Sequence, residues 1–156
     1  MLIHTIQYVV IFIGGFYMEM PKNKSVLDLI VQAMKAERHD AVKYKMMMEM
    51  TTDPEIKKQT NFAYEDELKH YQMFRQIYYQ LTGRVVNIPL PAEVEKYANI
   101  MDAVKSSIEG ENEAVDLYRD IHAMIPNQHM RDMVFEIITD EIEHANRFVY
   151  SYAMLK

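Results

Sequence analysis

The sequence of 156 residues predicts an all-α protein, a four-helix bundle with a long crossover between its second and third helices. Glycine and proline are scarce, at four and five residues, which suits long helices and disfavours a turn-rich β fold. Between residues 25 and 156, apolar side chains recur at three- and four-residue steps in four long segments. A chain of this length forms one domain with a proper core, so we expect the four helices to pack together.

The N-terminal segment, residues 1–17, differs in pattern from the rest. Its apolar run Tyr8–Ile13 is far shorter than the roughly 20 residues of a transmembrane helix, and no basic start marks a signal peptide. Two interpretations remain open. Residues 1–24 form an apolar arm, strand-like or helical, that covers a subunit contact, or translation starts at Met18 or Met20 and the upstream residues are a mis-called start.

Helix-capping residues mark the first two helices. Ser25 opens a capping box, and the helix that it starts is expected to end near Thr51. Asp53 is a good N-cap and Pro54 a good first helical residue for the second helix, which we expect to reach about Leu81 before a glycine ends it.

Residues 83–99 contain two prolines and no helical periodicity, so we expect an irregular connection with room for one short helix after Pro91. Extended, this connection reaches about 56 Å, ample for the length of a bundle. The third helix is predicted over residues 100–124 and the fourth over about 129–153.

Acidic residues occupy the predicted inward faces. Each of the four helices carries one glutamate in the middle of its apolar stripe, and two helices carry a histidine three residues later, on the same face. A buried, unpaired carboxylate costs several kcal/mol, and no lysine or arginine on these stripes offsets it. Paired iron or manganese suits such a set better than a lone zinc or calcium. The candidate ligands are Glu37, Glu67, His70, Glu111, Glu141 and His144.

An internal repeat strengthens this signal, because six residues recur after 74 positions. The pairs are Glu37 and Glu111, Tyr44 and Tyr118, Asp66 and Asp140, Glu67 and Glu141, His70 and His144, and Phe74 and Phe148. The chain therefore reads as a duplicated helical hairpin whose halves hold one site. A twofold axis across the bundle makes the second and third helices parallel, which requires the long connection.

Four further residues are candidates to support the ligands. Tyr44 and Tyr118 are expected to donate a hydrogen bond to a ligand carboxylate, with core filling as the alternative. Asp66 and Asp140 each precede a ligand glutamate. Because ligating imidazoles usually donate their free N–H, we expect each aspartate to accept from the histidine of the opposite repeat, with solvent exposure as the alternative.

The segments AERHDAVKY, EDELKHYQMF, EGENEAVDLY and DEIEHANRF resemble the ferritin-like di-iron carboxylate superfamily, and within it the rubrerythrin branch. The resemblance covers about residues 25–156. It implies that the six candidates bind two iron ions, with manganese or zinc as substitutes, and that Glu67 and Glu141 bridge them. The chain departs from rubrerythrins at Ala114, where they carry an additional glutamate, and it has no cysteine for their rubredoxin domain.

This resemblance implies an enzyme: a non-haem di-iron oxidoreductase that reduces hydrogen peroxide or dioxygen with electrons from a separate, rubredoxin-like donor. Iron storage with ferroxidase activity and a non-catalytic, metal-stabilised bundle are the alternatives. We expect a cytoplasmic homodimer that acts in oxidative stress, without a membrane or nucleic-acid partner. The net charge of −6 argues against nucleic-acid binding, and the lack of cysteine excludes disulfides and thiolate metal sites.

Overall fold

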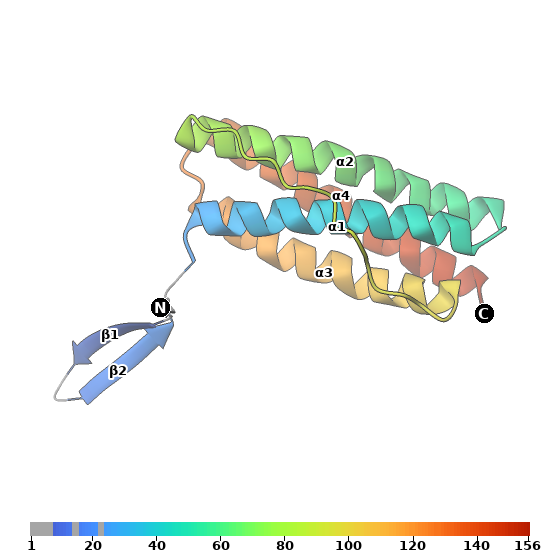
Figure 1. The fold of residues 1–156 in the computed structure, drawn as a ribbon, viewed down its shortest axis with the longest axis horizontal. Coiled ribbons are helices and arrows are strands. Elements are labelled where there is room, and N and C mark those ends of the chain that lie inside the picture. The colour runs from blue at the N-terminus through green and yellow to red at the C-terminus, as the bar shows by residue number, and fades with distance from the viewer. Residues whose placement is uncertain (1–7, 14–15, 22–23) are drawn as a thin grey trace.

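The bundle consists of four helices, α1 Val26–Met50, α2 Pro54–Thr82, α3 Ile100–Met124 and α4 Gln128–Met154 (Figure 1). The computed structural model describes residues 8–13, 16–21 and 24–156. The predicted all-α bundle is confirmed, and the observed helix ends agree with the expected ones to within about one residue.

Side chains and one glycine set these helix ends. Each helix begins at a residue whose side chain accepts a hydrogen bond from a backbone N–H of the first turn; these residues are Ser25, Asp53, Asn99 and Asn127. At the end of α2, Gly83 adopts φ 68° and donates its N–H to the carbonyl of Tyr79. Glycine adopts this left-handed conformation readily, so the chain leaves α2 there without strain.

The helices are connected as the internal repeat predicts. The pairs α1–α2 and α3–α4 are antiparallel hairpins, while α2 and α3 run in the same direction (Figure 1). The yellow-green connection of residues 83–99 therefore travels the length of the bundle from the end of α2 to the start of α3 (Figure 1). This twofold arrangement brings the middles of all four helices to the same level.

No short helix follows Pro91, in contrast to the expectation from the sequence. Tertiary contacts hold the connection against the bundle instead. Glu95 lies 2.7 Å from Nε2 of His39 on α1, and the hydroxyl of Tyr97 lies 2.8 Å from Oγ of Ser106 on α3. These contacts favour an extended path over a helical turn.

The apolar core has two parts. A large cluster fills the end of the bundle where α1 and α4 begin, and a smaller one, which includes Tyr44 and Phe148, fills the opposite end. The ligand candidates lie between these clusters along every helix. The two clusters therefore separate this polar layer from water at both ends of the bundle.

Two strands precede the bundle, β1 Tyr8–Ile13 and β2 Phe16–Pro21, and they pair antiparallel. They fall within the predicted arm, of which residues 1–7, 14–15 and 22–23 lie outside the described residues. Its role at a subunit contact stays a prediction, as does the alternative start at Met18 or Met20. Within the part of the chain that the structure describes, no helix combines the length and apolarity needed to cross a membrane.

Candidate metal centre

Four glutamates and two histidines meet at the middle of the bundle. Helices α1 and α3 each contribute one glutamate, and α2 and α4 each contribute a glutamate and a histidine one turn apart. Every one of the six is at most 2% exposed. They are the six residues named from the sequence: Glu37, Glu67, His70, Glu111, Glu141 and His144.

These side chains form two overlapping groups, and within each group one ligand atom per residue lies within 4.8 Å of all the others. The first group is Glu37, Glu67, His70 and Glu141, and the second is Glu67, Glu111, Glu141 and His144. Glu67 and Glu141 belong to both groups. Each group could hold a metal ion, and Glu67 and Glu141 could contribute to both ions.

Several of these buried polar atoms have no hydrogen-bond partner among the described residues: Oε2 of Glu37, Oε1 of Glu67, Nδ1 of His70 and Oε1 of Glu141. Nδ1 of His70 lies 3.0 Å from that Glu141 oxygen and 3.5 Å from the Glu37 oxygen, without hydrogen-bond geometry. An unsatisfied buried polar atom costs about 1–3 kcal/mol. A cation among these atoms would satisfy all of them, so the donor set fits a metal centre.

The protonation of the glutamates and histidines also indicates a metal centre. Burial opposes charge on the imidazoles, but hydrogen bonds to Asp140 and Asp66, together with the neighbouring glutamates, raise the pKa of both His70 and His144 to about 12. Burial and the charge of Glu141 raise the pKa of Glu67 and Glu111 well above the ordinary value. Protons thus balance the acidic cluster where no cation does, and metal ions would displace them on binding.

Two tyrosines hold the glutamates of α1 and α3. The Tyr44 hydroxyl donates to Oε1 of Glu111, and the Tyr118 hydroxyl donates to Oε1 of Glu37, so each bond links one repeat to the other. Burial and the nearby carboxylates raise the pKa of both phenols well above 10. The tyrosines therefore stay neutral donors, and the carboxylates keep one orientation.

Removal of either hydroxyl tests this role. We expect Tyr44→Phe and Tyr118→Phe each to weaken metal binding about 10-fold or more, because the freed carboxylate samples other rotamers. Titration of the purified variants with Co²⁺, followed by visible absorption, measures the loss. Tyr64→Phe on α2, which changes a tyrosine outside the site, is the control. Affinities equal to that of the control would show that the two phenols only fill the core.

Two aspartates accept from the histidines across the twofold axis. Nε2 of His70 lies 3.0 Å from Oδ2 of Asp140, and Nε2 of His144 lies 3.2 Å from Oδ2 of Asp66. The bond to His144 comes first among the causes that lower the pKa of Asp66 to about 2. An ionised aspartate keeps the imidazole proton on Nε2, so Nδ1 is available to a metal ion.

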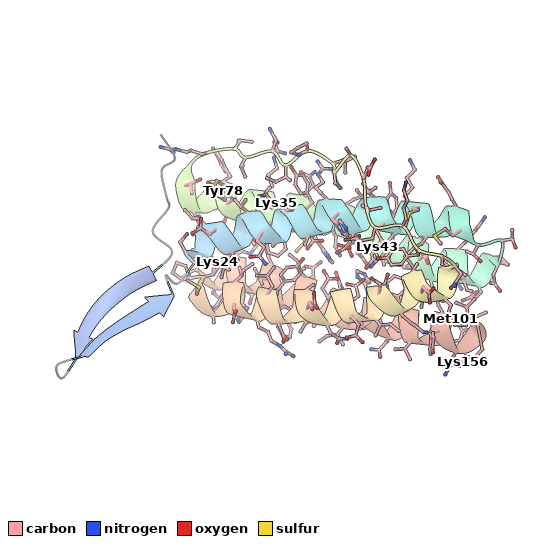
Figure 2. All side chains as sticks on the ribbon, turned by 60° about the horizontal axis from the view of Figure 1, so that its bottom comes forward. Lys24, Lys35, Lys43, Tyr78, Met101 and Lys156 are labelled. Carbon is pink, nitrogen blue, oxygen red and sulfur yellow. The ribbon has the colours of Figure 1, made fainter. Side chains whose placement is uncertain are left out.

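A pocket of about 520 Å³ opens between α1 and α3 beneath the crossover. Its wall includes the small residues Ala36, Gly110 and Ala114, of which the first two directly precede the ligand glutamates of α1 and α3. Lys43, labelled in Figure 2, also lines it and donates to Oγ of Ser106 at 3.3 Å. Sequence reasoning missed this pocket, because the path of the crossover creates it.

Comparison with known protein sequences finds a relative in Bacillus subtilis. The chain is 25% identical over 108 residues to the uncharacterized protein YhjR of Bacillus subtilis (strain 168), which covers 69% of this chain and 72% of that protein. No family model matches.

Comparisons with solved structures support the observed fold. A hypothetical protein from Pyrococcus furiosus matches with a TM-score of 0.75 and 22% identity, over 84% of this chain and 90% of that one. A conserved hypothetical protein from Mycobacterium tuberculosis matches with a TM-score of 0.72 and 13% identity, over 82% of this chain and 90% of that one. A two-domain protein from Anabaena variabilis contains DJ-1/ThiJ/PfpI-like and ferritin-like domains. It matches with a TM-score of 0.64 and 16% identity, over 83% of this chain and 36% of that one. A ferritin-like domain is therefore present in one structural neighbour.

Proposed function

We propose that this chain is a rubrerythrin-like, non-haem di-iron oxidoreductase that reduces hydrogen peroxide or dioxygen. The observation that carries the proposal is the pair of overlapping ligand groups that share Glu67 and Glu141. Carboxylate oxygens with one imidazole per group suit iron or manganese. The twofold symmetry of the groups supports two ions of similar surroundings.

Reduction of hydrogen peroxide to two waters takes two electrons and two protons, and two ferrous ions bound here would supply both electrons as they become ferric. The chain's own residues prepare the place for that chemistry. Phe74 packs on Tyr118 with ring centroids 4.9 Å apart, and Phe148 packs on Tyr44 at 5.1 Å. These rings shield the tyrosine–glutamate hydrogen bonds from water, so the ligand carboxylates stay in one arrangement.

The electrons that restore the ferrous state come, in this proposal, from a separate protein. The sequence has no cysteine, so these residues hold no thiolate-bound iron that could relay electrons. A rubredoxin-like carrier is the class of donor that fits. In this proposal the chain provides the buried site at which two electrons are transferred to one peroxide molecule.

The test mixes anaerobic protein, loaded with two ferrous ions per chain, with hydrogen peroxide. We expect both irons to be oxidised by one peroxide, faster than free ferrous ion under the same conditions. Glu143→Ala, an exposed change next to the site, should behave as the wild type. Oxidation no faster than that of free ferrous ion would contradict the proposal and favour a non-catalytic bundle, and uptake of many irons per chain would favour storage.

A further inference from the structure

The two aspartates that hold the imidazoles share one cation. Nζ of Lys69 on α2 lies 3.1 Å from Oδ1 of Asp66 and 2.8 Å from Oδ2 of Asp140. It also lies 3.4 Å from Oε1 of Glu136 on α4. The Lys69 side chain therefore joins α2 to α4 directly outside the two histidines.

This cation breaks the symmetry of the repeat. The position equivalent to Lys69 in the second repeat, 74 residues later, is Glu143, which pairs with Arg147. The ligands, tyrosines and aspartates thus occur twice, while a lysine at this place occurs once and contacts both aspartates. One side chain acts on both halves of the site.

The charge of the site explains why a cation is needed there. The four glutamates and two aspartates carry two more negative charges than two divalent ions neutralise, so the two aspartates would repel each other without a further cation. Asp66 and Asp140 point at the same ammonium group with one oxygen each. Asp140 uses Oδ2 for both Lys69 and His70, so the position of that oxygen depends on both partners.

We infer that Lys69 is a positioning residue that sets the orientation of both imidazoles toward the metal ions, an inference that rests on the proposed function. The ammonium fixes the two aspartate oxygens, each aspartate fixes the Nε2–H of one histidine, and the Nδ1 atoms then face the shared glutamates. Loss of the ammonium loosens both aspartates at once. Both ions are therefore bound more weakly, although Lys69 itself touches neither.

Titration with Co²⁺ alone, followed by visible absorption, tests the inference. We expect Lys69→Met to weaken both binding steps about 10-fold, at the low end of the effect of residues that orient metal ligands. Lys69→Arg keeps the charge and should retain most of the affinity. Lys58→Met is the matched control, because Lys58 lies on the same helix and, among the described residues, pairs only with Glu55 in the first turn of α2, at 3.4 Å. Its affinity should equal that of the wild type.

A second readout separates positioning from a merely structural role. In zinc-loaded protein, the Nε2–H proton resonances of His70 and His144 should both shift and exchange faster in Lys69→Met than in Lys58→Met. Affinity and both resonances equal to those of Lys58→Met would overturn the inference while leaving the proposed function intact. A change in only one resonance would overturn the shared role. If the wild type binds no cobalt, the proposed function itself fails, and the inference fails with it.

Discussion

Replacement of Glu141 by alanine is expected to abolish tight binding of both metal ions, whereas Glu37→Ala should leave one ion bound. The difference follows from the geometry, because Glu141 belongs to both ligand groups and Glu37 to only one. Oε2 of Glu141 also lies 2.9 Å from Nδ1 of His144, the nitrogen that would bind a metal ion. Metal content after loading with Co²⁺ and desalting measures the result: two ions per chain for the wild type, about one for Glu37→Ala, and close to none for Glu141→Ala.

The control for this prediction is Glu143→Ala, which removes an exposed carboxylate two residues away on the same helix. It should retain both ions. Equal losses in Glu37→Ala and Glu141→Ala would mean that no carboxylate is shared and that the two ions depend on each other in another way. Retention of two ions in Glu141→Ala would remove this residue from the site.

The six ligand candidates could be predicted because helix geometry converts sequence spacing into a shared face. Residues three apart on a helix lie side by side, so Glu67 with His70 predicts a local pair without knowledge of the fold. The 74-residue repeat then supplies the tertiary information that spacing alone lacks. It predicts which aspartate meets which histidine, and the distances between Asp140 and His70 show that pairing.

The crossover and its contacts could not be predicted in the same way. Residues 83–99 have no periodicity, and their path depends on side chains such as Glu95 and Tyr97 that find partners on α1 and α3. A local rule predicts room for a helix after Pro91, and these tertiary contacts override it. Lys69 was missed for a related reason, because a lysine beside a histidine looks like helix surface until α4 brings Asp140 to it.

The N-terminal hairpin shows the limit of an apolar pattern. The run Tyr8–Ile13 is short, apolar and rich in β-branched residues, so its sequence fits a strand or a buried helical turn. The structure pairs it with Phe16–Pro21 as a strand. The pairing partner, rather than the run itself, decides between the two.

Addition of divalent metal is expected to raise the thermal unfolding midpoint of the chain by roughly 10 °C. A ligand at 1,000 times its dissociation constant stabilises the folded state by about 4 kcal/mol, and about 1 kcal/mol shifts the midpoint of a domain of this size by roughly 2–4 °C. The cations would bind where buried oxygens of Glu37, Glu67 and Glu141 have no hydrogen-bond partner within the described part of the chain. Calorimetry with Co²⁺ or Zn²⁺, and with a chelator as the reference, measures the shift.

The variant Glu67→Met should be more stable than the wild type without metal and should not be stabilised by added metal. Burial and the charge of Glu141 raise the pKa of Glu67, and its Oε1 has no hydrogen-bond partner among the described residues, so this glutamate destabilises the metal-free fold. An apolar side chain of similar volume removes this unsatisfied oxygen, so it should stabilise the metal-free protein by about 1–3 kcal/mol. The same change removes a shared ligand, so added metal should no longer raise the midpoint.

Glu65→Met, an exposed change on the same helix, should leave both the metal-free midpoint and its response to metal near those of the wild type. A Glu67→Met protein that is less stable without metal, yet still stabilised by metal, would show that Glu67 serves the fold rather than the ions. The expected result is a Glu67→Met protein that is more stable without metal and unaffected by added metal. That result would mean that the buried carboxylates lower the stability of the metal-free bundle and are present because they bind cations.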